Sequence, residues 1–166
     1  MGRYYDEFTE GQTFVTPRRT VTERDVMQFA QLTGDFNPLH TDFEYAKTNR
    51  FGRPVAHGLL GLGLVLGLAS SLNVFDHTAV ALLGIEQWRF VAPVFFGDSV
   101  YATITITKMR LTREGRYGIL YRHAQLLNQN GELVQEGDIH IMMHRKPVNE
   151  RVEGLGEKGQ SDAGEA

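Results

Sequence analysis

The stretch VAHGLLGLGLVLGLASSL, residues 55–72, is the most apolar part of this 166-residue chain. Glycine recurs along it, and it carries no Asp, Glu, Lys or Arg. Glycine in an exposed helix costs about 1 kcal/mol relative to alanine, but a buried helix tolerates it where a backbone or a ligand comes close. A helix needs about 20 residues to span a bilayer, and this stretch is shorter. We therefore expect one long buried helix at the centre of the fold.

Four segments with strand character follow this helix. They cover residues 80–90, 100–109, 117–128 and 133–144. Their residues are β-branched or aromatic with partial alternation, which is typical of strands. Asn130-Gly131 predicts a type I′ hairpin turn between the last two segments, and Glu114-Gly115 predicts the turn before them. These short connections favour an antiparallel sheet.

The residues before the central helix predict a broken strand and then a short helix. Residues 13–21 alternate loosely, and Pro17 interrupts them. Thr22 can cap a helix because its hydroxyl accepts a hydrogen bond from a free backbone N–H of the first turn. Gly34 is a typical helix stop. Residues 35–41 are expected to form a loop, stiffened by Pro38.

A second short helix is expected from Asp42 through Lys47. The whole pattern predicts an α+β domain over residues 1–146, in which a curved antiparallel sheet wraps around one central helix. Residues 147–166 lose the apolar pattern and are expected to be a disordered tail. Because such a sheet leaves edges that a second copy can pair with, we expect a homodimer or higher homo-oligomer.

Composition narrows the function classes. The net charge is −3, and the basic residues are scattered, so neither nucleic acid nor a membrane surface is an expected partner. The chain has no cysteine, which excludes disulfides, thiolate nucleophiles and cysteine-bound metals. The N-terminal residues contain no apolar stretch of signal-peptide length. We expect a cytoplasmic protein.

The segment FAQLTGDFNPLH, residues 29–40, brings a carboxylate and an imidazole together. Asp35 and His40 lie five positions apart in a loop that Pro38 stiffens, so both side chains can point at one spot. A pair of this kind can hold one water molecule and move its protons. The Asp35–Pro38 run alone is equally compatible with a simple turn.

The segment FGRPVAHGLL, residues 51–60, leads into the apolar helix. The first amides of a helix lack intrahelical acceptors and carry a partial positive charge. Glycine at position 58 lets a substrate oxygen approach that backbone, so the helix start predicts an oxyanion hole, in which one donor is worth roughly 3–4 kcal/mol. His57 either contacts the substrate or bonds to a backbone carbonyl as a structural residue.

These motifs resemble the MaoC-like, (R)-specific enoyl-CoA hydratases. The resemblance rests on Gly-Asp-x-Asn-Pro-x-His at 34–40, on Ala-His-Gly-Leu at 56–59, and more weakly on Phe-Val-Ala-Pro-Val at 90–94 and Gly-Asp-Ser-Val at 97–100. It covers roughly residues 8–145. It implies a hotdog fold, in which a curved antiparallel sheet wraps a long helix, and hydro-lyase activity on an acyl-CoA thioester.

The resemblance also implies residue roles. Asp35 and His40 would be the catalytic pair, Asn37 would orient His40 or the water, and the Gly58 amide would bind the thioester carbonyl. Beside these roles, His57 remains a candidate for substrate contact. Some members carry a serine two turns into the central helix that supports the catalytic aspartate. This chain has Leu66 there, so Asn37 or a backbone amide would have to support Asp35. No metal or other cofactor is implied apart from CoA, or an acyl carrier protein, as part of the substrate.

Two other functions fit parts of the pattern. A hotdog thioesterase also uses a carboxylate and a helix end, but the Asp-x-Asn-Pro-x-His pattern argues against it. A non-catalytic acyl-thioester-binding domain is the other alternative, and the presence of both candidate catalytic residues argues against that one. The sequence leaves open the acyl length and branching, the carrier, the physiological direction, and which of Asp35 and His40 is the base. Coupled groups of this kind titrate as a pair.

Overall fold

The computed structural model describes residues 2–147 of the chain. Its strands form an antiparallel sheet in the order β1-β4-β5-β6-β3, and β2 also pairs with β4. The strands are β1 (Thr13–Val15), β2 (Arg19–Thr20), β3 (Ala79–Phe90), β4 (Ser99–Leu111), β5 (Tyr117–Leu127) and β6 (Leu133–His144). All four predicted long strands are present. The predicted disordered tail, beyond its first residue, lies outside the described residues.

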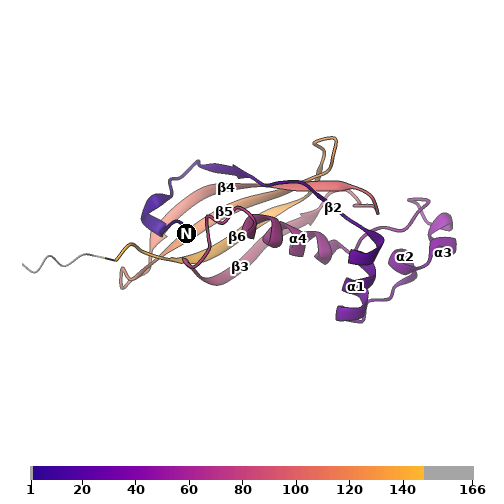
Figure 1. Ribbon diagram of the computed structural model, residues 1–166, viewed down its shortest axis with the longest axis horizontal. Helices are drawn as coiled ribbons and strands as arrows, with labels where there is room; N and C mark the ends of the chain where they lie inside the picture. Colours follow the sequence, from indigo (N-terminus) through magenta and orange to yellow (C-terminus); the bar gives the residue numbers. More distant parts are fainter. Residues whose placement is uncertain (1, 148–166) are drawn as a thin grey trace, which may run out of the picture.

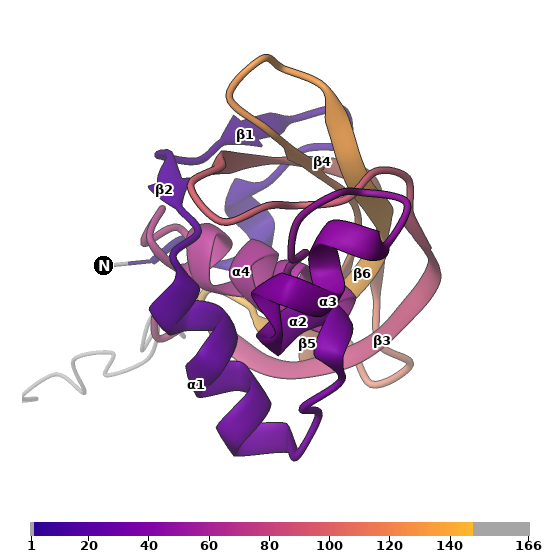
Figure 2. The same ribbon diagram turned by 90° about the vertical axis from the view of Figure 1, so that its right-hand side faces the viewer.

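The α-helices lie either inside the curve of the sheet or beyond one end of it. The helical elements are a short 3-10 turn η1 (Tyr5–Glu7), then α1 (Glu23–Thr33), α2 (Pro38–Thr41), α3 (Phe43–Thr48) and α4 (Gly58–Ser70). Figure 2 shows the sheet curving around α4, and Figure 1 shows α1, α2 and α3 lying beyond one end of the sheet. The predicted arrangement, a curved antiparallel sheet around one central helix, is therefore confirmed.

The core lies between α4 and the concave face of the sheet. Val65 of α4 is fully buried, and Leu68 is nearly so, against Ile104, Leu120 and Ile139 of three neighbouring strands. Burying one such side chain contributes about 1.5–3 kcal/mol. This packing fixes the axis of α4 relative to the sheet, and so it also fixes where the N-terminus of α4 emerges.

The ends of α1 follow the predicted signals. Thr22 is the N-cap, and its hydroxyl accepts a hydrogen bond from the Asp25 amide while the Asp25 side chain bonds back to Thr22. Gly34 ends the helix in the left-handed conformation, with a φ of 79°, which glycine adopts at little cost. The chain therefore turns sharply just before Asp35.

Two local predictions were wrong. Residues 38–41 form the one-turn helix α2 within the predicted loop, because Pro38 fits the first turn of a helix that Asn37 caps. The turn at Asn130-Gly131 is not type I′, since only Gly131 has a positive φ. A longer loop, closed by a bond from the Asn128 amide to the Glu132 carbonyl, joins β5 to β6 instead.

Strand β3 forms one edge of the sheet and leaves apolar side chains uncovered. Val80, Leu82, Leu83 and Ile85 are each 39–49% exposed. A second copy pairing along this edge would cover them, and the expected homodimer stays a prediction. No helix within residues 2–147 is long and apolar enough to cross a membrane.

Candidate active site

His40 sits on a helical turn whose start is fixed by Asn37. The Asn37 side-chain oxygen accepts a hydrogen bond from the Leu39 amide at 2.9 Å, and the Asn37 carbonyl accepts one from the His40 amide at 2.9 Å. Asn37 thus orients the backbone that carries His40. Among the described residues it makes no hydrogen bond to the His40 ring, so its predicted action on the ring or on a water stays a prediction.

Within residues 2–147, the His40 ring makes one hydrogen bond. Its Nδ1 lies 2.7 Å from the Val55 carbonyl oxygen. A carbonyl oxygen only accepts, so Nδ1 carries the proton and Nε2 of the neutral ring keeps a free lone pair. Burial lowers the pKa of His40, and the neighbouring His57 adds to this, against the opposing effects of the Val55 bond and the Asp35 charge. The site thus favours neutral His40 with Nε2 as an acceptor.

His57 is a buried neighbour of His40 and holds the backbone of Asp35. It is 3% exposed, and its Nε2 donates to the backbone carbonyl of Asp35 at 2.9 Å. Its ring stacks on that of His40, with centroids 3.8 Å apart. These contacts match the structural alternative that the sequence left open for His57. Contact with a substrate stays a prediction, because His57 does not line the cavity described below.

Asp35 is oriented by backbone groups. Its side chain is 52% exposed, and one carboxylate oxygen accepts a hydrogen bond from the Asn37 amide at 3.3 Å. In place of a serine on the central helix, the Asn37 backbone amide therefore supports the Asp35 carboxylate, which is one of the two alternatives that the sequence analysis gave. Leu66 lies elsewhere, beside two smaller cavities further along α4.

Asp35, His40 and His57 each place one possible ligand atom within 4.8 Å of the other two. Three nitrogen and oxygen ligands are the number that a catalytic zinc ion uses. Here, however, one ring nitrogen of each histidine bonds to a backbone carbonyl. Each imidazole therefore has one ring nitrogen left for a further ligand. The same atoms are well placed to hold a water molecule.

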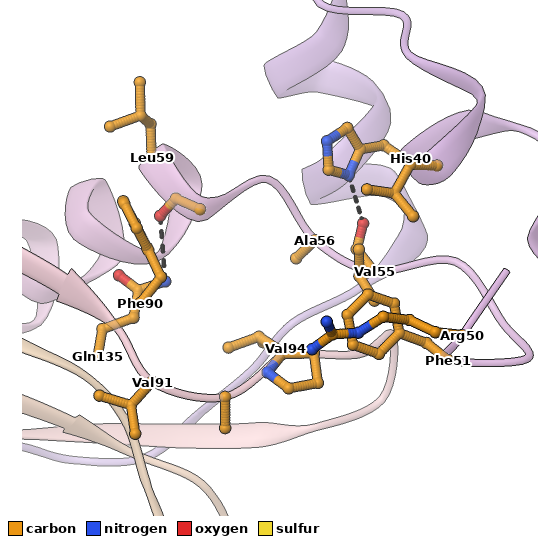
Figure 3. A pocket seen from close by; sticks show the side chains of 14 residues that line it. His40, Arg50, Phe51, Val55, Ala56, Leu59, Phe90, Val91, Val94 and Gln135 are labelled. Atoms are coloured by element: carbon orange, nitrogen blue, oxygen red, sulfur yellow. Dashed lines mark hydrogen bonds between the residues drawn. The ribbon is translucent and has the colours of Figure 1, made fainter.

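A largely apolar cavity of about 500 Å³ opens beside His40. This volume is typical of small-molecule sites. Its walls come from the α2–α3 region, from the start of α4, from the segment after β3 and from β6. They include Leu39, His40, Phe51, Val55, Ala56, Leu59, Phe90, Val94 and Gln135. In Figure 3, His40 and Gln135 lie on opposite sides of Ala56.

Gly58 is the first residue of α4 and lines the same cavity. Its amide and that of Leu59 have no acceptor within the helix, so they can bind a substrate oxygen. A Cβ on Gly58 would lie 2.8 Å from the Phe90 ring. The close neighbour of Gly58 is therefore the side chain of the last residue of β3.

Gln135 closes the cavity at the end away from His40. It is 3% exposed, donates to the Gly58 carbonyl at 3.1 Å, and accepts from the Trp88 indole at 3.2 Å. A Cβ on Gly61 would lie 2.1 Å from the Gln135 amide nitrogen. The sequence analysis missed Gln135. A signal for it was present in the sequence. Every second residue of β6, such as Ile139 and Ile141, faces the core, and Gln135 is a polar residue at one of these positions.

Solved structures place the fold in a known class. A monoamine oxidase regulatory protein from Archaeoglobus fulgius aligns with a TM-score of 0.82 and 34% identity over 88% of this chain and 97% of that one. A Mycobacterium tuberculosis protein described as having a double hotdogfold aligns with a TM-score of 0.79 and 18% identity, over 99% of this chain and 53% of that one. The chain has a hotdog fold, as expected.

The chain belongs to the MaoC-like dehydratase domain family, whose sequence profile matches residues 7–125. It is 31% identical to an (R)-specific enoyl-CoA hydratase from Rhodospirillum rubrum, over 84% of this chain and 91% of that protein. It is 36% identical to protein MaoC from Klebsiella aerogenes, over 62% of this chain but only 30% of that longer protein. A 3-hydroxybutyryl-CoA dehydratase from Methylorubrum extorquens is 29% identical over 86% of this chain and 85% of that protein, so the relatives include proteins named hydratases and dehydratases.

Proposed function

We propose that this protein adds water to the C2=C3 double bond of a trans-2-enoyl thioester, or removes water from the (R)-3-hydroxyacyl thioester. The observation that carries the proposal is the free Nε2 of His40, which lines the apolar cavity, together with the Asp35 carboxylate, which lies within 4.8 Å of a His40 ring nitrogen. The (R) stereochemistry is supported by the names of two relatives, from Rhodospirillum rubrum and Aeromonas caviae.

The proposed reaction starts with the thioester carbonyl on the free amide of Gly58. The N-terminus of α4 stabilises the negative charge that develops on the carbonyl oxygen as an enolate forms. Asp35 and His40 each accept a hydrogen bond from one water, whose oxygen attacks C3 while the pair takes up one proton. The pair then returns a proton to C2 on the same face, so that one water is added in total.

The test is the ultraviolet absorbance of crotonyl-CoA, whose conjugated enoyl thioester is lost on hydration. We expect the absorbance to fall without release of free CoA thiol, and protein dialysed against a chelator should be equally active. Release of thiol would instead identify a thioesterase. Binding of crotonyl-CoA and of longer enoyl-CoAs without turnover would identify a non-catalytic domain.

We expect hydration to remain near its maximal rate as the pH falls below 6.5, the ordinary pKa of histidine. Burial lowers the pKa of His40, so the ring stays neutral at a pH where an exposed histidine is already charged. Protonation would remove the Nε2 lone pair, so activity is lost only below that lowered pKa. The measurement is kcat/KM against pH, and an acid limb at or above 6.5 would contradict this assignment.

Gln135 is expected to limit the acyl length. Replacing Gln135 by alanine removes the amide that fills the space over Gly61, and the ratio of kcat/KM for octenoyl-CoA to that for crotonyl-CoA should rise roughly ten-fold or more. The control is Gln125→Ala, since Gln125 pairs with Glu136 on the opposite face of the sheet. An unchanged ratio in folded Gln135→Ala protein would place the acyl chain elsewhere.

A further inference from the structure

Arg122, in the middle of β5, is a buried basic residue whose side chain points into the core. The residue is 3% exposed, and it forms no ion pair within residues 2–147. Its Nε donates to the Ile139 carbonyl at 3.2 Å, and its guanidinium carbon lies 4.9 Å from the centre of the Phe75 ring. Burial alone lowers its pKa to about 10, so it remains charged at neutral pH. An uncompensated buried charge is strongly destabilising, so the surroundings of Arg122 favour the binding of an anion.

The side chain of Arg122 lines a cavity of about 360 Å³. The cavity lies at the C-terminal half of α4, between that helix, the loop before β3, and the sheet. Most of its lining is apolar, from Leu66, Ala69, Phe75, Leu82 and Ile141. It shares no lining residue with the cavity beside His40.

We propose that this second cavity binds an aliphatic carboxylate, with the carboxylate on the Arg122 guanidinium and the chain against the apolar lining. A planar guanidinium presents paired N–H donors that match the two oxygens of a carboxylate. The apolar walls disfavour a small hydrated anion such as phosphate. The other titratable residues of the cavity are Asp76, which is half-buried, and His77, which is exposed.

The carboxylate has two possible sources. It belongs either to a separate ligand, such as a free fatty acid, or to the far end of a dicarboxylic acyl thioester. The second source rests on the proposed hydratase function, whereas binding of a free carboxylate does not.

The first experiment is calorimetric titration of the protein with decanoate and with decan-1-ol. We expect decanoate to bind at one site per chain and decanol to bind much more weakly. Arg122→Met keeps the length of the side chain without its charge, and should weaken decanoate binding by about 10–100-fold, the value of a hydrogen bond to a charged group. Arg122→Lys should fall between the two. Asp35→Asn should bind decanoate as the wild type does.

Melting curves show whether a loss of decanoate binding comes from the lost guanidinium or from unfolding of the variant. Removing a buried charge in favour of a similar apolar group is often neutral or stabilising, so folded Arg122→Met protein should melt at or above the wild-type temperature but lose the upward shift that decanoate causes. No decanoate binding by the wild type, equal binding of decanoate and decanol, or unaltered binding by folded Arg122→Met would each overturn the proposal. The first of these results would also be expected if a second copy supplied the counter-charge.

The second experiment separates the two sources. It compares kcat/KM for decenoyl-CoA with that for the same thioester ending in a carboxylate. If Arg122→Met lowers only the second value, the carboxylate belongs to the substrate. If it lowers neither while decanoate binding is lost, the cavity holds a separate ligand. Both results support a carboxylate site at Arg122.

Discussion

Replacing Asp35 by asparagine is expected to lower kcat for crotonyl-CoA hydration by about 10²–10⁴-fold, the usual range for general acid–base assistance. Asparagine has nearly the same shape and keeps an oxygen that can accept the bond from the Asn37 amide. It cannot take up the proton of the attacking water. Because the Asp35 side chain is 52% exposed, the variant should fold and melt as the wild type does.

The matched control for this prediction is Glu44→Gln. Glu44 lies on α3 in the same group of helices, its side chain is 82% exposed, and it pairs with Lys47 at the surface. Its loss should change neither activity nor stability measurably. His40→Ala should lose as much activity as Asp35→Asn, and combining the two should cost little more, because residues that act as a unit are not additive. Asp35→Asn protein with more than about a third of wild-type activity would remove Asp35 from the mechanism.

The sequence predicted the elements whose signals are local. The capping hydroxyl of Thr22 and the positive φ of Gly34 are properties of single residues, and both ends of α1 followed from them. The strand 133–144 was predicted with the bounds that β6 has. The central helix was located by its apolar stretch, although it begins only at Gly58, because Val55 and Ala56 instead bond to Leu39 and Val94.

What the sequence could not supply was the set of contacts between distant segments. The Val55 carbonyl that fixes the tautomer of His40, and the Asp35 carbonyl that holds His57, are backbone groups that no side-chain pattern reveals. Glycines on α4 show the same limit. Gly61 does have a close neighbour, Gln135, whereas a Cβ on Gly63 would meet nothing within 4 Å in the described chain. The glycines of one apolar stretch therefore differ in whether a neighbouring residue leaves room for a side chain.

Gly137 on β6 links the stability of the sheet to the shape of the cavity beside His40. A Cβ there would lie 2.8 Å from the Trp88 backbone, 2.6 Å from its indole ring and 3.1 Å from the Glu86 carbonyl. The pairing of β3 with β6 shifts register at this point, and Gln87 takes a positive φ of 50°. Trp88, whose indole bonds to Gln135, thus lies directly against Gly137 at this irregular point of the pairing.

Gly137→Ala is therefore expected to destabilise the fold by about 3 kcal/mol, at the upper end of the usual cost of overpacking, because backbone atoms and not a flexible side chain must move. For a chain of this size that lowers the melting temperature by roughly 6–12 °C. The control is Gly63→Ala on the open side of α4, which should be neutral or stabilising by up to about 1 kcal/mol. If Gly137→Ala melts with the wild type, β3 and β6 can separate there at little cost, and the inward position of Trp88 does not depend on their close approach. If it is destabilised as expected, the displaced Trp88 should also shift Gln135, so the acyl-length preference of the surviving folded protein should broaden.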